Sequence, residues 1–78
     1  MKILAFGIVK DIFNNSMIDV TVENESTIDI LKKELEAKYP RLGQLGSYMV
    51  AINNEYASDD DVVNAVDEIA IIPPVSGG

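Results

Sequence analysis

The sequence contains no cysteine, no histidine and no tryptophan among its 78 residues. Without cysteine no disulfide can form, and a structural zinc site loses its commonest ligands. Without cysteine or histidine, the usual nucleophile–base pairs of covalent catalysis are excluded, as is a persulfide held on a side chain. Any covalent chemistry of this chain must therefore use another group.

Basic residues are also scarce, since six lysine and arginine side chains against thirteen acidic ones give a net charge of −7. This charge repels nucleic-acid phosphates and anionic lipids, so we expect neither nucleic acid nor a membrane as a partner. No segment approaches the roughly 20 apolar residues of a membrane span. The apolar start of the chain is broken at Lys10 and Asp11, which favours a first strand over a signal peptide. We expect a cytoplasmic protein whose partners are basic proteins.

Two segments, residues 2–8 and 68–72, are rich in strand-forming residues and apolar on both alternating faces. This pattern is typical of central strands, whereas the alternation of residues 17–22 indicates an edge strand. Residues 11–16 contain two successive asparagines, a turn signal of suitable length for joining two strands. The first half of the chain therefore predicts a hairpin.

One helix is expected over residues 27–39, where apolar side chains recur at helical spacing. Ser26 stands three residues before Asp29 and predicts a capping box at its start. Pro40 ends the helix, because the residue before a proline is driven out of helical geometry. After a glycine-containing loop, residues 48–56 indicate a strand, a turn and a short strand.

This order of strands around one helix is that of a β-grasp domain, an α+β fold whose first and last strands pair in parallel at the centre of a mixed sheet. We expect residues 1–72 to form this domain and residues 73–78 to form an extended tail. One main helix covers only one face of the sheet, so apolar side chains on the other face need a partner protein as cover. Phe6, Tyr56 and Ile72 are candidates for this interface. The alternative is that they belong to the core.

The most specific pattern is the final segment, which follows directly on the last strand. It consists of Pro73, Pro74, Val75, Ser76, Gly77 and Gly78. The segment resembles the end of the molybdopterin synthase small subunit, a family of ubiquitin-like sulfur carriers. Residues 6–11 and 50–53 add weaker similarity, and the resemblance extends over the whole chain in length and element order. It departs from the family at Val66, where a glycine often precedes the acidic pair.

The resemblance implies that the chain is the sulfur carrier subunit of a molybdopterin synthase, in molybdenum cofactor biosynthesis, and is not itself an enzyme. An adenylating enzyme would use ATP to activate the Gly78 carboxylate and would then replace the adenylate with sulfur. The resulting thiocarboxylate would donate sulfur for the dithiolene of molybdopterin at the large subunit of the synthase. The implied assembly is a hetero-oligomer in which this chain binds no cofactor and no metal.

The residue types of the tail suit that chemistry. Glycine has no Cβ, so two final glycines can enter a narrow active site and leave the terminal carbonyl open to attack. The two prolines have a fixed φ and no amide hydrogen, so they stop the sheet and direct the following residues as an extended arm. Such an arm can thread into a partner's cleft while the domain docks outside it.

Other functions stay open from the residues alone. A ubiquitin-like protein modifier also ends in two glycines, but its terminus forms an amide with a lysine of a target. Sulfur carriers of the same fold serve thiamine synthesis or transfer-RNA thiolation, although they usually lack the proline pair. In a plain interaction module, Gly78 would be dispensable. Asp59, Asp60 and Asp61 favour a solvated turn over a metal site, because successive carboxylates point in different directions.

Overall fold

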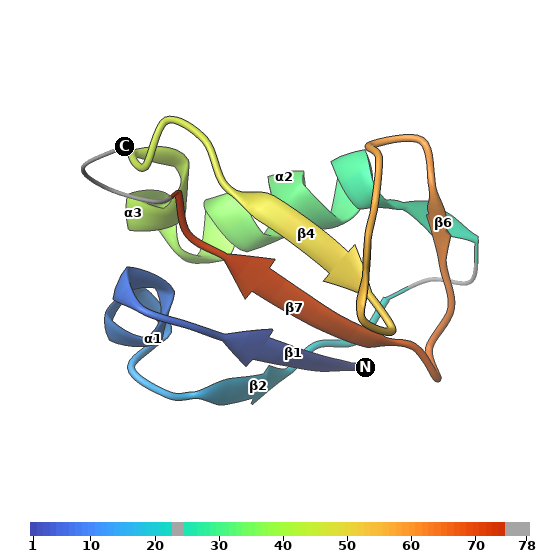
Figure 1. Cartoon of the computed structure of the whole chain (residues 1–78), viewed down its shortest axis with the longest axis horizontal. Coiled ribbons are helices and arrows are strands. Elements are labelled where there is room, and N and C mark those ends of the chain that lie inside the picture. The colour runs from blue at the N-terminus through green and yellow to red at the C-terminus, as the bar shows by residue number, and fades with distance from the viewer. Residues whose placement is uncertain (23–24, 75–78) are drawn as a thin grey trace.

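The first and last strands lie side by side at the centre of a five-stranded mixed sheet (Figure 1). The computed structural model describes residues 1–22 and 25–74. The strands follow the order β2-β1-β7-β4-β5, and only the β1–β7 pair is parallel, with Lys2 opposite Glu68. Their bounds are β1 Lys2–Ala5, β2 Met17–Asp19, β4 Met49–Ile52, β5 Glu55–Tyr56 and β7 Glu68–Ile72. The predicted β-grasp arrangement, with β2 at an edge, is confirmed.

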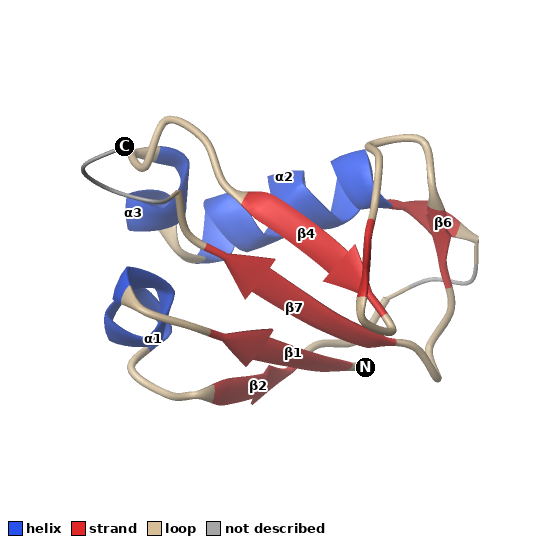
Figure 2. Cartoon of the chain, in the orientation of Figure 1, coloured by secondary structure: helices blue, strands red, loops and turns tan. Residues whose placement is uncertain are grey.

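The main helix, α2 (Ile28–Lys38), covers one face of this sheet (Figure 2). Its N-cap is Thr27, whose Oγ1 accepts a hydrogen bond from the Ile30 amide at 3.5 Å. The predicted capping box on Ser26 is therefore wrong by one residue. None of the helices within residues 1–22 and 25–74 has both the length and the apolar character of a membrane span. The core between helix and sheet consists of Ile3, Ala5, Val9, Phe13, Ile28, Leu31, Leu35, Leu42, Val50, Val63, Ile69 and Ile71.

A short helix, α1 (Ile8–Phe13), occupies the connection between β1 and β2. The sequence predicted a strand through Ile8 followed by a simple turn, and this prediction is wrong. Gly7 has φ 54° and ψ −130°, a conformation that favours glycine, and the strand ends at Ala5, two residues before it. The helix then buries Val9 and Phe13, which lie four residues apart on one helical face.

A second short helix, α3 (Pro40–Gly43), begins where α2 stops. Proline at a first helical position needs no amide hydrogen, so Pro40 both ends α2, as predicted, and starts α3. Leu42 is fully buried and closes the core at this end. This helix was not predicted from the sequence, since its four residues are too few to show a helical period.

The acidic loop before β6 (Val62–Val63) supports the start of α2. β6 pairs with β3 (Ser26–Thr27) in a small second sheet. The carbonyl oxygens of Asp61 and Asp59 accept hydrogen bonds from the first amides of α2 at 2.9 and 3.0 Å.

Two carboxylates of this loop are engaged within the domain. The Asp59 carboxylate pairs with Lys32 at 2.8 Å, while that of Asp61 accepts from the Ser58 amide at 2.7 Å. Within residues 1–22 and 25–74 no acidic cluster is arranged to hold a metal ion.

Candidate functional site at the uncovered face of the sheet

The central sheet has one face turned away from α2, which we call the open face. Side chains alternate along a strand, so the burial of Ile3, Ile69 and Val50 on the helix side sends their neighbours to the other side. The open face is apolar toward the end of β7 and charged toward its start. Its members are Lys2, Leu4, Phe6, Met17, Asp19, Met49, Ala51, Tyr56, Glu68, Ala70 and Ile72.

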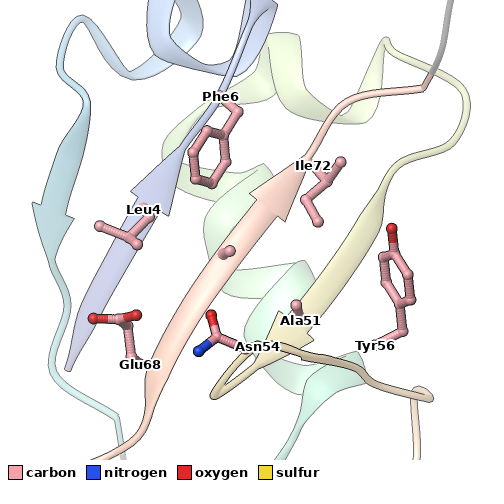
Figure 3. Close-up of a pocket in the computed structure, with 8 residues that line it drawn as sticks. Leu4, Phe6, Ala51, Asn54, Tyr56, Glu68 and Ile72 are labelled. Atoms are coloured by element: carbon pink, nitrogen blue, oxygen red, sulfur yellow. The ribbon is translucent and has the colours of Figure 1, made fainter.

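A hollow of about 280 Å³ lies in the open face (Figure 3). Its floor is made of two small residues, Ala51 and Ala70, which are paired across β4 and β7. Larger side chains form its rim, and among them Phe6 is 47% and Tyr56 69% exposed. The lining consists of Leu4, Phe6, Ala51, Asn54, Tyr56, Glu68, Ala70 and Ile72.

The structure brings together Phe6, Tyr56 and Ile72, the three residues proposed from sequence for a partner interface. Because the first two are exposed, the alternative that they are core residues does not hold for them. Sequence reasoning missed the small floor, since two alanines carry no signal of their own. Glu68 was also overlooked, although strand alternation places it on the same side as Ile72.

The hollow has a polar end formed by Glu68 and Asn54, opposite the end at Phe6 (Figure 3). Asn54 belongs to the β4–β5 turn, where it and Asn53 both have positive φ, at 73° and 50°. Such a turn joins antiparallel strands tightly, and asparagine tolerates the geometry. No ion pair among residues 1–22 and 25–74 engages the Glu68 carboxylate.

Asn53 fixes this polar end in place through its side chain. Its Nδ2 donates to Asp67 Oδ1, and its Oδ1 accepts from the Glu68 amide, both at 3.0 Å. The Asp67 amide donates to the Asn64 carbonyl at 2.9 Å, which closes the turn before β7. Val66 lies in this turn and is 93% exposed, and its φ is not positive. The turn thus accommodates valine without needing glycine.

The tail begins beside the apolar end of the open face. β1 and β7 run parallel, and the register that sets Ala5 opposite Ile71 brings Phe6 next to Ile72. Pro73 is half-buried and Pro74 is exposed, so the chain leaves the sheet here. The predicted tail residues Val75, Ser76, Gly77 and Gly78 lie outside the described residues. Pro73 and Pro74 therefore lie at the same end of the strands as the apolar end of the hollow.

The comparisons with known proteins agree with this geometry. Residues 3–78 match the ThiS family. The chain belongs to this family. The molybdopterin synthase sulfur carrier subunit of Dictyostelium discoideum is 40% identical over 82 residues, which cover 99% of this chain and 94% of that protein. The protein of the same name from Arabidopsis thaliana is 35% identical over 100% of this chain and 82% of its own length.

A solved structure provides a further comparison for this ThiS-family chain. The crystal structure of SAMP1 from Haloferax volcanii superposes with a TM-score of 0.84 at 26% identity, covering 100% of this chain and 98% of the other. SAMP1 is a small archaeal modifier protein. The ubiquitin-like β-grasp fold predicted from sequence is confirmed, as is the resemblance to the sulfur carrier subunits.

One polar cluster of the ThiS-family chain lies on the helix side, away from the open face. The Tyr48 hydroxyl donates to Glu36 Oε2 at 2.6 Å, and the Lys32 ammonium stands 5.5 Å from the centre of the Tyr48 ring. Burial, reinforced by the neighbouring Glu36 carboxylate, raises the pKa of Tyr48 well above its ordinary value. The cluster joins α2 to the segment before β4 and contributes to the scaffold.

Proposed function

We propose that this chain carries sulfur on the carboxylate of Gly78 and donates it as the sulfur carrier subunit of a molybdopterin synthase. The observation that carries the proposal is similarity along nearly the whole chain to proteins that bear this name, one of them 40% identical. The match to the ThiS family includes the tail up to residue 78. The lack of cysteine and histidine agrees with a sulfur attached to the main chain.

The proposed cycle has three steps. A separate activating enzyme joins the Gly78 carboxylate to the AMP portion of ATP, and pyrophosphate leaves. Hydrosulfide or an equivalent sulfur nucleophile then displaces AMP, which takes one carboxylate oxygen with it and leaves a thiocarboxylate. At the large subunit the thiocarboxylate sulfur attacks a carbon of the pterin precursor and displaces an oxygen substituent, which leaves with the electron pair of its bond. Water then cleaves the carbonyl–sulfur bond, so the sulfur stays on the precursor and the Gly78 carboxylate is restored. Each turn thus consumes one ATP and one sulfur.

The described domain would act as the handle for the tail. A partner that covers the hollow contacts Phe6 and Ile72, and the tail leaves the sheet beside these two residues. Docking on the open face would therefore hold Pro73 at the mouth of the partner's cleft. The gain is one of proximity, because a docked domain presents its tail at a high effective concentration.

In this scheme the chain supplies no catalytic side chain, and its assembly with the large subunit is a hetero-oligomer. The chain binds no cofactor or metal, and ATP is used by the activating enzyme. Partner surfaces that meet this chain are expected to be basic, since its net charge is −7. Nucleic acid and membranes are not partners in the scheme. The proposed location of the cycle is the cytoplasm, where ATP is available.

The decisive test is the intact mass of the chain isolated from cells that contain the activating enzyme. We expect the mass change of one oxygen replaced by sulfur. A variant with one alanine appended after Gly78 should lack this change, because its Gly78 carbonyl is locked in an amide. Ser76→Ala, which leaves the terminal carboxylate intact, is the control and should retain it. A wild-type chain that never acquires sulfur contradicts the proposal.

A protein-modifier function is the second candidate, favoured by the structural likeness to the archaeal modifier SAMP1 at 26% identity. In that case the activated Gly78 carbonyl would be attacked by a lysine amine of another protein, with loss of AMP. The same mass experiment separates the two functions. Adducts of this chain joined to lysines of other proteins, without any thiocarboxylate, would show the modifier function and contradict the sulfur carrier function.

A further inference from the structure

The side chains at the floor of the hollow are too small to fill it. Ala51 and Ala70 meet at its centre, and alanine has no side chain beyond Cβ. Around them stand larger residues, of which Phe6 and Tyr56 project outward and are 47% and 69% exposed. A hollow of about 280 Å³ with a small floor and an apolar rim has room for one large side chain. Interface anchors commonly fill pockets of this kind.

The polar end of the hollow, opposite Phe6, is suited to bind a positively charged group. Glu68 and Asn54 line it, and within the described ranges the Glu68 carboxylate has no ion-pair partner. Asn53 holds the Glu68 backbone by a 3.0 Å hydrogen bond, so the position of this end is fixed. A guanidinium or ammonium group placed here would meet a carboxylate and an amide oxygen together.

Charge also decides between a second copy of this chain and a different protein. Two copies would each carry a net charge of −7, and pairing their open faces would bring two Glu68 carboxylates into one interface, where they repel each other. A hollow facing a hollow also leaves both floors unfilled. A basic protein with a projecting apolar side chain satisfies both ends of the site.

We infer that the open face receives one large apolar side chain of a partner on the Ala51–Ala70 floor, beside an arginine or lysine that pairs with Glu68 and Asn54. This inference rests on the proposed function and adds the chemistry of the contact that the partner makes. Ala70 sets the size of the inserted side chain, and Glu68 sets the charge beside it. Recognition thus has a shape component and a charge component at opposite ends of one hollow.

The test measures the affinity of the full-length chain for the large subunit of the synthase from the same organism, by titration calorimetry. Ala70→Leu fills the floor, and its control Ala65→Leu makes the same change at an exposed turn residue outside the hollow. Glu68→Lys reverses the charge, and its control Glu34→Lys changes the net charge equally on exposed α2. The intact-mass measurement of the thiocarboxylate is made on the same wild-type preparation.

We expect Ala70→Leu and Glu68→Lys each to weaken binding about tenfold or more, and both controls to stay within about twofold. Raising the salt concentration should weaken the wild type more than Glu68→Lys. Equal losses in a variant and its control, or normal binding by both variants, overturn the inference. So does a wild-type dimer that the two variants dissociate, which would assign the face to a second copy.

The docking inference and the sulfur carrier function are contradicted by different results. A wild-type chain that acquires sulfur but does not bind the large subunit overturns the docking inference and leaves the sulfur carrier function standing. A chain that binds as expected but never acquires sulfur retains the docking site and loses the function. Ala70→Leu could disturb the sheet, so its thermal unfolding is measured alongside, and Glu68→Lys tests the site independently of packing.

Discussion

A Cβ atom on Gly7 would stand 3.1 Å from Cγ of Pro73. The break between β1 and α1 is therefore packed directly against the first residue of the tail. Gly7 also has φ 54°, where residues with side chains are strained. One glycine thus shapes the turn that ends β1 and leaves space for the proline that ends β7.

Replacing Gly7 with alanine should lower the free energy of unfolding by about 2–4 kcal/mol, from backbone strain together with crowding of Pro73. Urea denaturation measures this loss. Gly46→Ala is the matched control, because Gly46 has φ 82° and open space around its Cβ position, so it reports strain alone. Adding Pro73→Ala to Gly7→Ala removes the crowding atom. If the double variant recovers no stability, the contact is not a source of the loss.

Asn53→Gly should cost about 1–3 kcal/mol, because it removes the two hydrogen bonds that join the β4–β5 turn to Asp67 and Glu68. Glycine keeps the positive φ of this position accessible, so the loss reports the side chain. Asn54→Gly, at the next residue and also at positive φ, is the control and should stay within about 0.5 kcal/mol. Thermal unfolding of both variants decides the matter, and equal losses would refute this account of Asn53.

The stability of the domain should fall in alkaline solution through Tyr48. The pKa of Tyr48 is raised in the folded state by burial and by Glu36, whereas an unfolded tyrosine titrates at about pH 10. Below that pH the hydroxyl is protonated in both states and its full contribution is present. As the pH rises further, the unfolded state loses the proton first, so unfolding becomes easier.

The measurement is urea unfolding at a series of pH values from neutral to strongly alkaline. Tyr48→Phe should cost about 1 kcal/mol at neutral pH, from the lost hydrogen bond to Glu36. It should also decline less steeply than the wild type above about pH 10. Parallel alkaline curves for the two proteins would show that Tyr48 does not contribute to this pH dependence.

Phe6→Asp should weaken activation of the chain without unfolding the domain, since Phe6 is 47% exposed at the rim of the hollow. We expect a change of less than about 1 kcal/mol in stability and a loss of about tenfold or more in the rate of adenylation. Val66→Asp is the control, with the same change of charge at an exposed apolar residue outside the hollow. Loss of the fold in Phe6→Asp, or equal loss of adenylation in Val66→Asp, would contradict this prediction.

The sequence predicted the elements whose residues alternate or recur over a sufficient length. β7 was predicted with its observed bounds, Glu68–Ile72, because a doubly apolar run ends at a proline pair. α2 followed from its helical spacing, and only its cap was misplaced. β3 and β6 were missed, since two residues each are too few for any periodicity.

The first strand shows why other features could not be predicted. Ile8 and Val9 are strand formers, and nothing in their identity reveals that Gly7 turns the backbone before them. Packing of Val9 and Phe13 into the core outweighs local propensity here. The rim of the hollow could be foreseen from apolar residues on the uncovered face. Its floor could not, because pairing Ala51 with Ala70 requires the register between two strands.

The parallel pairing of β1 with β7 joins residues near opposite ends of the described chain, such as Lys2 and Glu68. β7 is also the neighbour of β4, so two strands of the sheet, β1 and β4, pair with it. During synthesis, a nascent chain that has not yet reached residue 72 therefore lacks the strand that completes its core. Such long-range pairing makes folding slow relative to helical domains. An activating enzyme that recognises the open face would ignore unfinished chains, because Ala70 and Ile72 build part of that face.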